Sequence, residues 1–208
     1  ANMTGVMEDE RRKQTEQKLI ESGKAEFLKK GYAKANLRDI CKAAGVTTGA
    51  FYFSFANKEA LLAAILDPVI ADYERMCSMF AQREEEDPGT ADDNERQMME
   101  YLSAHWTEAV ILMDQCAGSR YEMFKPQIKL QMQEAFTSYF TKFMGRKPDA
   151  ELIRILVSMR LQGYMELIKG DYTVDERVRM SREIGIHADA GTEALIKYLN
   201  QEYKACRK

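Results

Sequence analysis

The segment TTGAFYFSF, residues 47–55, places four aromatic rings close together behind two threonines and a glycine. Small side chains let a backbone approach another surface closely. Hydroxyl groups can donate to phosphates or base edges, and a threonine methyl can meet a thymine methyl. Phe51 and Phe55 are four positions apart, so on a helix they share one face and are expected to anchor it to a core. Tyr52 and Phe53 then point elsewhere, which makes them candidates for an intermolecular contact.

Two predicted helices position this segment. The first follows Asn36, a good N-cap residue, and its apolar residues recur at spacings of three and four, which gives one clean face. Gly45 supplies a left-handed C-cap, and the second helix starts near Thr47. The tight turn AGVT therefore joins the two helices with the geometry of a helix-turn-helix. The second helix of such a unit lies in the DNA major groove with its N-terminal end first.

Neighbouring side chains extend the predicted contact. Tyr52 offers a hydroxyl to a phosphate and a ring to the groove wall. Lys58 starts a helix capped by Asn57 and can reach the DNA backbone, and Arg38 could contact a phosphate or a guanine. Residues 1–62 hold 11 Lys/Arg and 8 Asp/Glu, a net charge of +3, whereas the rest holds 19 and 25, a net charge of -6. A basic first third on an acidic body suits an anion-binding module.

Residues 19–62 closely resemble the DNA-binding domain of TetR-family transcriptional regulators. The resemblance is carried by LRDICKAAGV and by TTGAFYFSFANKEALL after it, which is close to the family's usual form SxGTLYxYFxxKEELL. It implies a repressor that dimerises and releases its operator when a small molecule binds. It also implies a helix-turn-helix DNA-binding domain over residues 9–56 and a larger helical ligand-binding and dimerisation domain over residues 57–208.

The resemblance assigns DNA contacts by position. The implied set is Asn36, Arg38, Thr47, Thr48, Gly49, Tyr52 and Lys58. Phe53 stands where a polar residue is usual, so it is kept as an apolar contact to double-stranded DNA and not as a hydrogen-bonding one. Ala50 replaces a common hydroxyl residue, which removes one expected phosphate contact. Glu26 replaces a usual apolar core residue, which predicts a locally altered contact of the first helix.

Helical spacing also dominates the rest of the chain, so we expect an all-α fold of about nine helices. The first spans about 10–30. Pro68 predicts a kink in the fourth helix or a restart with Asp67 as cap. Acidic residues and a Pro-Gly pair predict an exposed loop over 84–94. Further helices are expected over residues 95–116, 119–125, 126–144, 149–169 and 174–204.

The family resemblance implies a pocket for a small-molecule effector among the helices after Pro68. Methionine and aromatic side chains form the adaptable, mostly apolar walls that such pockets need. The predicted lining is Met99, Leu102, His105, Trp106, Met113, Tyr121, Phe124, Met132, Phe136, Met159 and Tyr164. No cofactor and no metal site is expected.

The two longest C-terminal helices are predicted to form a homodimer. Helix 149–169 has apolar residues on more than one face, so it must be buried on both sides. With helix 174–204 it is expected to make a two-fold four-helix contact, because C2 dimers are the commonest oligomers. Burial inside one subunit is the alternative. Operator release would follow from a ligand-induced shift of the fourth helix, with Pro68 as the point of bending.

The sequence argues against other classes of protein. Its longest apolar runs cover only a few residues, so we expect neither a membrane span nor a signal peptide. It has two histidines far apart, and it contains no nucleophile elbow, phosphate loop or HExxH motif, so we do not expect an enzyme. The cysteines form no CxxC pair, which argues against structural zinc and favours a reducing cytoplasm. Of these, Cys41 and Cys77 are expected to be buried.

Two other roles stay open. A protein of this fold could use DNA binding for assembly or division instead of transcription, and many scattered binding sites would then replace one operator. A helical partner-binding module without DNA affinity is the other possibility. The small lead-in from Thr47 to Gly49 argues against it, because a decayed site would tolerate larger residues there.

Overall fold

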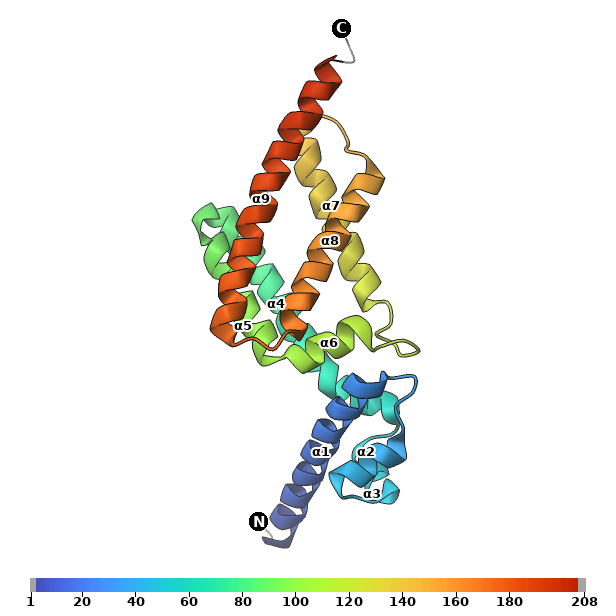
Figure 1. The fold of residues 1–208 in the computed structure, drawn as a ribbon. Coiled ribbons are helices and arrows are strands. Elements are labelled where there is room, and N and C mark those ends of the chain that lie inside the picture. The colour runs from blue at the N-terminus through green and yellow to red at the C-terminus, as the bar shows by residue number, and fades with distance from the viewer. Residues whose placement is uncertain (1–2, 206–208) are drawn as a thin grey trace. The chain divides into compact units, whose positions relative to one another are not determined.

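The computed structural model describes residues 3–205 and is drawn in Figure 1. Within those residues the chain forms nine α-helices, one 3-10 helix and no strand, which confirms the all-α prediction. The elements are α1 Met3–Lys30, α2 Leu37–Ala44, α3 Thr48–Ser54, α4 Lys58–Glu86, η1 Pro88–Thr90, α5 Ala91–Ala104, α6 Trp106–Asp114, α7 Phe124–Met144, α8 Ala150–Lys169 and α9 Val174–Ala205. None of the described helices combines the length and the apolar character needed to cross a membrane. Cys206 lies outside the described residues.

The helices group into two compact units. The N-terminal unit comprises Ala1–Ala81 and His105–Phe124, so it holds α1 to α3, most of α4, and α6. The C-terminal unit comprises Gln82–Ala104 and Lys125–Lys208, so it holds α5, α8, α9 and nearly all of α7. The domain boundary expected after residue 56 stays a prediction.

The core of the N-terminal unit forms from the apolar faces of its helices. Its fully buried side chains are Leu19, Phe27, Ile40, Phe51, Leu61, Leu62, Leu66 and Ile111. A Cβ added at Gly23 of α1 would stand 2.9 Å from the Leu61 side chain of α4, so this glycine lets the two helices pack closely. Cys41 is buried as predicted. The prediction for Cys77 is wrong: it is exposed, because it lies beside the buried stripe of α4 and not in it.

The predicted caps fix where the helices of the helix-turn-helix begin and end. The side chains of Asn36, Thr47 and Asn57 accept hydrogen bonds from backbone N–H groups two or three residues further on, at 2.9, 3.1 and 2.8 Å. Gly45 ends α2 with a φ of 68°, a left-handed conformation that favours glycine. The beginnings of α2, α3 and α4 are therefore set by local side-chain chemistry.

Helix α4 is continuous through Pro68 over 29 residues. The predicted restart with Asp67 as N-cap is therefore wrong. The carboxylate of Asp67 instead accepts hydrogen bonds from the Arg120 guanidinium at 2.7 and 2.9 Å and from the Tyr121 hydroxyl. Proline removes one backbone donor from the helix, but buried side chains on both sides of it keep this part of α4 in the core.

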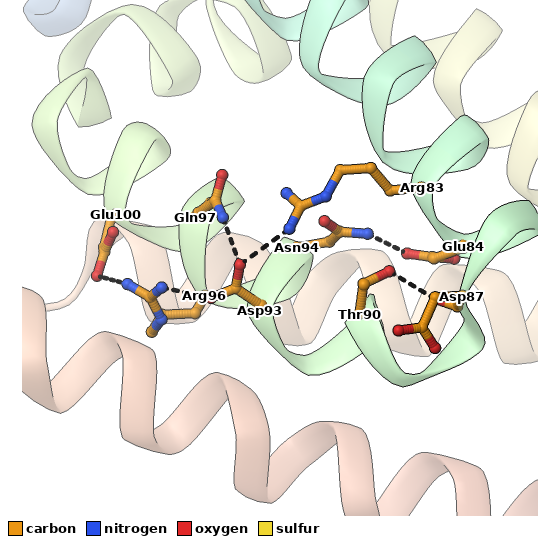
Figure 2. Close-up of polar contacts among 9 residues, drawn as sticks. All are labelled: Arg83, Glu84, Asp87, Thr90, Asp93, Asn94, Arg96, Gln97 and Glu100. Atoms are coloured by element: carbon orange, nitrogen blue, oxygen red, sulfur yellow. Dashed lines mark hydrogen bonds and ion pairs between the residues drawn. The ribbon is translucent and has the colours of Figure 1, made fainter.

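The acidic segment over residues 84–94 is mostly exposed, as predicted, but it forms a structured corner and not a loop (Figure 2). Helix α4 continues into it, η1 turns the chain, and α5 begins within it. Arg83 donates to Asp93 at 3.2 Å, and the amide of Asn94 donates to Glu84 at 2.9 Å. Acidic side chains in the first turn of a helix are favourable, so the same residues that suggested a loop stabilise the start of α5.

Two further helix predictions are wrong. The helix expected over residues 95–116 is broken at His105, whose φ of -114° and ψ of 32° are not helical, and it forms α5 and α6. Ile111 of α6 enters the core of the N-terminal unit, so tertiary packing and not periodicity sets this break. The segment over residues 119–125 forms turns up to the start of α7, with Gly118 at a φ of 79°. The number of described helices agrees with the prediction, but the boundaries of these helices differ from the predicted ones.

In the C-terminal unit, α9 packs along α5 and α8. The buried core of this unit includes Phe140, Ile153, Val157 and Ile196. Glu95 of α5 accepts hydrogen bonds from the Tyr164 hydroxyl of α8 at 3.1 Å and from the Ser181 hydroxyl of α9 at 2.7 Å. One carboxylate therefore ties three helices together.

Candidate nucleic-acid interface

Helix α3 has one buried face and one exposed face. Phe51 is fully buried, Phe55 is nearly so, and their ring centroids are 5.7 Å apart. This confirms that these two rings anchor the helix to the core. The helix has seven residues, too few to be stable alone in water, so this anchor holds it in place.

The opposite face of α3, called the exposed α3 face below, carries Thr48, Gly49, Tyr52 and Phe53. Tyr52 is 58% exposed, and its ring packs edge-on against Phe51 with the centroids 5.4 Å apart. Phe53 is 84% exposed, more than any other large hydrophobic side chain in the described part of the chain. Four of the predicted DNA contacts therefore lie on one surface.

Gly49 lies in the middle of the exposed α3 face. A Cβ built at this glycine would find its nearest neighbour at Oγ1 of Thr47, 3.7 Å away, which is ordinary van der Waals distance. The backbone there is helical. The fold itself therefore does not require a glycine, and the open space is available to a molecule outside the protein.

Charged residues border this face but do not enter it. No residue from 43 to 57 is charged, whereas Lys42 precedes the segment and Lys58 follows it. Arg38 and Lys42 are exposed on α2. An uncharged surface between cations suits a groove in which base edges lie between two phosphate backbones.

Two predicted contact residues also serve as caps. Oδ1 of Asn36 and Oγ1 of Thr47 already accept backbone hydrogen bonds. A contact with DNA would therefore use the amide N–H groups of Asn36 and the hydroxyl hydrogen of Thr47, which are donors. Phosphate oxygens accept hydrogen bonds from such donors, so each residue can cap its helix and contact a phosphate at the same time.

Lys58 has a role that the sequence did not indicate. Its ammonium donates to the backbone carbonyls of Tyr32 at 2.6 Å and Ala35 at 3.1 Å, and it lies 4.4 Å from the centroid of the Tyr32 ring. Lys58 therefore holds the turn between α1 and α2 against the start of α4. Its predicted DNA contact stays a prediction, and one ammonium hydrogen remains for it.

Glu26 fastens α1 to the beginning of α2. Its carboxylate accepts from the backbone N–H of Asn36 at 3.3 Å and pairs with Lys30 at 2.8 Å, and Lys30 also pairs with Asp39 at 3.0 Å. Hydrogen bonds to Glu26 and then to Asp39 raise the pKa of Lys30. A carboxylate near a helix N-terminus is favourable, which explains a charged residue at a position where an apolar one is usual.

The turn before α2 is also held by the connection between α6 and α7. The backbone N–H of Tyr32 donates to the carbonyl of Gln115 at 2.8 Å, and that of Arg120 donates to Glu59 at 2.8 Å. Burial, and then a hydrogen bond with Glu59, raises the pKa of Tyr32 to about 12. Glu59 therefore orients both the turn and the connection, and no sequence motif marked it for this role.

Helix α6 is joined to α1 by an ion pair of low exposure. Nζ of Lys24 lies 2.7 Å from the carboxylate of Glu108, with 23% and 9% of the two side chains exposed. Burial lowers the pKa of Lys24, but the hydrogen bonds and charges of Glu108 and Glu21 together outweigh it, so the pKa is raised. The pair therefore links α6 to α1, the helix that precedes the helix-turn-helix.

The predicted ligand-lining residues fall in both compact units. Those in the N-terminal unit are His105, Trp106, Met113, Tyr121 and Phe124, and those in the C-terminal unit are Met99, Leu102, Met132, Phe136, Met159 and Tyr164. Met99 and Tyr121 are buried, whereas Trp106 is partly exposed and Met159 is 66% exposed. The lining set stays a prediction.

A cavity of about 290 Å³ lies in the C-terminal unit between α5 and α9. Its lining is Asp92, Asp93, Glu95, Arg96, Val178 and Arg182, and none of these is a predicted ligand contact. Arg182 pairs with Asp92 at 3.2 Å, and Arg96 pairs with Asp93. Val178 is the one apolar residue among these described lining residues, whereas a typical ligand pocket is lined mainly by hydrophobic and aromatic residues.

Residues 19–65 match the sequence model of a family described as "Bacterial regulatory proteins, tetR family". The matched span contains all of α2 and α3 together with their caps. Residues 19–65 are therefore a TetR-family segment of this chain. The exposed α3 face therefore lies on the second helix of the helix-turn-helix of a TetR-family domain.

Curated relatives resemble this chain over part of its length. The HTH-type transcriptional regulator TtgR of Pseudomonas putida is 35% identical over 79 residues, which is 38% of each chain. The probable acrEF/envCD operon repressor of Escherichia coli is 49% identical over 47 residues, or 23% of this chain and 21% of that one. The chain thus matches well under half the length of these relatives.

A solved structure extends the likeness to most of the fold. A transcriptional regulator from Aquifex aeolicus aligns with a TM-score of 0.51 at 22% identity, over 81% of this chain and 96% of that one. At such identity the likeness concerns the fold alone. The all-helical fold of this chain beyond α4 therefore has a counterpart in that solved structure.

Proposed function

We propose that this chain is a DNA-binding transcriptional regulator of the cytoplasm, a repressor that binds a palindromic operator as a homodimer. The observation that carries the proposal is the exposed α3 face. The core holds α3 through Phe51, while Thr48, Tyr52 and Phe53 face solvent around an open Gly49. The second helix of a helix-turn-helix uses such a face to contact base edges.

Exposed apolar residues on α8 and α9 support the proposed homodimer. Ile155 and Met159, four residues apart on α8, are 43% and 66% exposed, and Ile186 of α9 is 63% exposed. Side chains of this kind are favourable to bury, and a two-fold contact between α8 and α9 of two copies would cover them. The dimer would then place two copies of α3 about one DNA turn, or a multiple of it, apart.

A small-molecule effector would release the operator. Similarity to a probable operon repressor of Escherichia coli supports repression, and the TetR-family segment supports an inducible mechanism. The effector must bind the DNA-incompetent conformation more tightly, because equal affinity for both conformations would shift no population. In the proposed route, effector binding bends α4 at Pro68, and this bend moves α3.

Selection from a randomised duplex library tests the proposal. The full chain is expected to enrich an inverted repeat, with affinity that falls steeply as salt rises because phosphate contacts release counterions. Tyr52→Ala should lose most of the affinity, since it removes a phosphate donor and a groove contact. Enrichment of no sequence at either of two salt concentrations would contradict DNA recognition. An enriched sequence without two-fold symmetry would contradict the dimer alone.

A further inference from the structure

We propose that Phe53 is a specificity-determining residue that recognises the 5-methyl group of a thymine in the major groove. The inference rests on the proposed function, because it needs α3 to enter DNA. It goes further by naming the chemical group of the operator that one side chain recognises.

The exposure of Phe53 is the first observation. With 84% of its surface in contact with water, it packs least of all the large hydrophobic side chains described. Phe51, two positions earlier, is fully buried in the core. A water-exposed aromatic ring is favourable to bury, so the ring of Phe53 is suited to an apolar group that arrives from outside.

The position of Phe53 on the helix is the second observation. Phe53 follows Gly49 by four positions, so the two residues lie on the same face of α3. A Cβ added at that glycine would have 3.7 Å to its nearest neighbour. A glycine on the same helix face as an exposed aromatic ring leaves room beside that ring for a group the size of a methyl.

The distribution of charge favours DNA over a protein partner. Residues 43–57 carry no charge, and cationic Lys42 and Lys58 stand at either end of this stretch. Phosphates would meet the cations at the edges, and base edges would meet the uncharged centre. Among the four bases only thymine presents a methyl group in the major groove, and phenylalanine is one of the side chains that contact it.

The test uses the duplex selected by the full wild-type chain. Each thymine of one half-site and its symmetry mate in the other is replaced by uracil, which removes the 5-methyl group and keeps the hydrogen-bonding groups. At one thymine position, each replacement by uracil is expected to lower the affinity of wild type about threefold to fivefold. This is the loss expected when one methyl group is no longer buried. Phe53→Ala should show no loss at that thymine, and Phe53→Leu, which keeps an apolar side chain, should retain part of it.

Phe143→Ala is the matched control, because it removes an exposed phenylalanine from α7 in the C-terminal unit. It should keep the full uracil effect. Equal uracil effects in wild type and Phe53→Ala at every thymine would overturn the proposal, as would selected half-sites without thymine. A change in self-association of Phe53→Ala without any change in DNA binding would assign the ring to a second copy and also overturn it. If wild type selects no sequence, the proposed function fails; if it selects one that is insensitive to uracil, only this inference fails.

Discussion

Replacing Phe51 by alanine is expected to lower the free energy of unfolding by about 3–5 kcal/mol, the usual cost of truncating a buried phenylalanine to alanine. Phe51 is fully buried, and its ring contacts those of Tyr52 and Phe55. Helix α3 is too short to persist without this anchor. Denaturant unfolding measures the change, and DNA binding should be lost with it.

Phe53→Ala is the matched comparison, since it makes the same change two positions along the same helix. Its ring is 84% exposed, so its removal should change the free energy of unfolding by less than about 0.5 kcal/mol. Similar losses in both variants would show that both rings are structural. That outcome would show that Phe53 packs within the protein and is not part of the exposed α3 face.

Breaking the ion pair between Lys24 and Glu108 is expected to cause the second large loss in the free energy of unfolding. Lys24→Met leaves a carboxylate that is 9% exposed without its nearest cation. We expect a loss of about 3 kcal/mol in the free energy of unfolding, at the low end of the range for a buried pair because the ammonium is partly exposed. The pKa of Lys24 is raised above its ordinary value. The stability that comes from this shift of Lys24 is therefore present at neutral pH and is lost as the pH rises through the raised pKa.

A double-mutant cycle separates the pair from its surroundings. Glu108→Leu should cost less than Lys24→Met, because Lys24 can turn to Glu21, 3.4 Å away, and to solvent. Lys24→Met combined with Glu108→Leu should recover much of the loss, because an apolar pair leaves no buried charge. Lys13→Met, which breaks an exposed pair with Asp9, should cause no measurable change. Additive losses in the double variant would show that the two residues act independently.

Local chemistry made the helix-turn-helix predictable. The caps at Asn36, Gly45 and Thr47 need only neighbouring backbone groups, so the sequence determines both ends of α2 and the start of α3. The buried positions Phe51 and Phe55 follow from their spacing of four. Contacts with DNA and effector are intermolecular, so those residues stay predictions until binding is measured.

Long-range packing explains what the sequence did not predict. The break at His105 has no glycine or proline to mark it, and it follows from the packing of α6 with α1 and of Ile111 in the core. Lys58 matches a DNA-contact position in the family motif, yet its ammonium binds carbonyls 23 and 26 residues earlier in the chain. Glu59 accepts a hydrogen bond from the backbone N–H of Arg120, which lies 61 residues further along the chain. Such pairings become visible only when the chain is folded.

The central claim is that the exposed α3 face contacts DNA, and Gly49→Leu tests it most directly. A Cβ at this exposed position makes only an ordinary van der Waals contact, 3.7 Å from Oγ1 of Thr47, so the variant should keep the free energy of unfolding within about 0.5 kcal/mol of wild type. Ala81→Leu adds similar bulk at an exposed position of α4 and is the control. The measurement is a titration of both variants and wild type against the selected duplex and a scrambled one. We predict that Gly49→Leu loses at least about tenfold in affinity for the selected duplex, about 1.4 kcal/mol or more, while Ala81→Leu binds as wild type does. Wild-type affinity in a folded Gly49→Leu variant would contradict the claim.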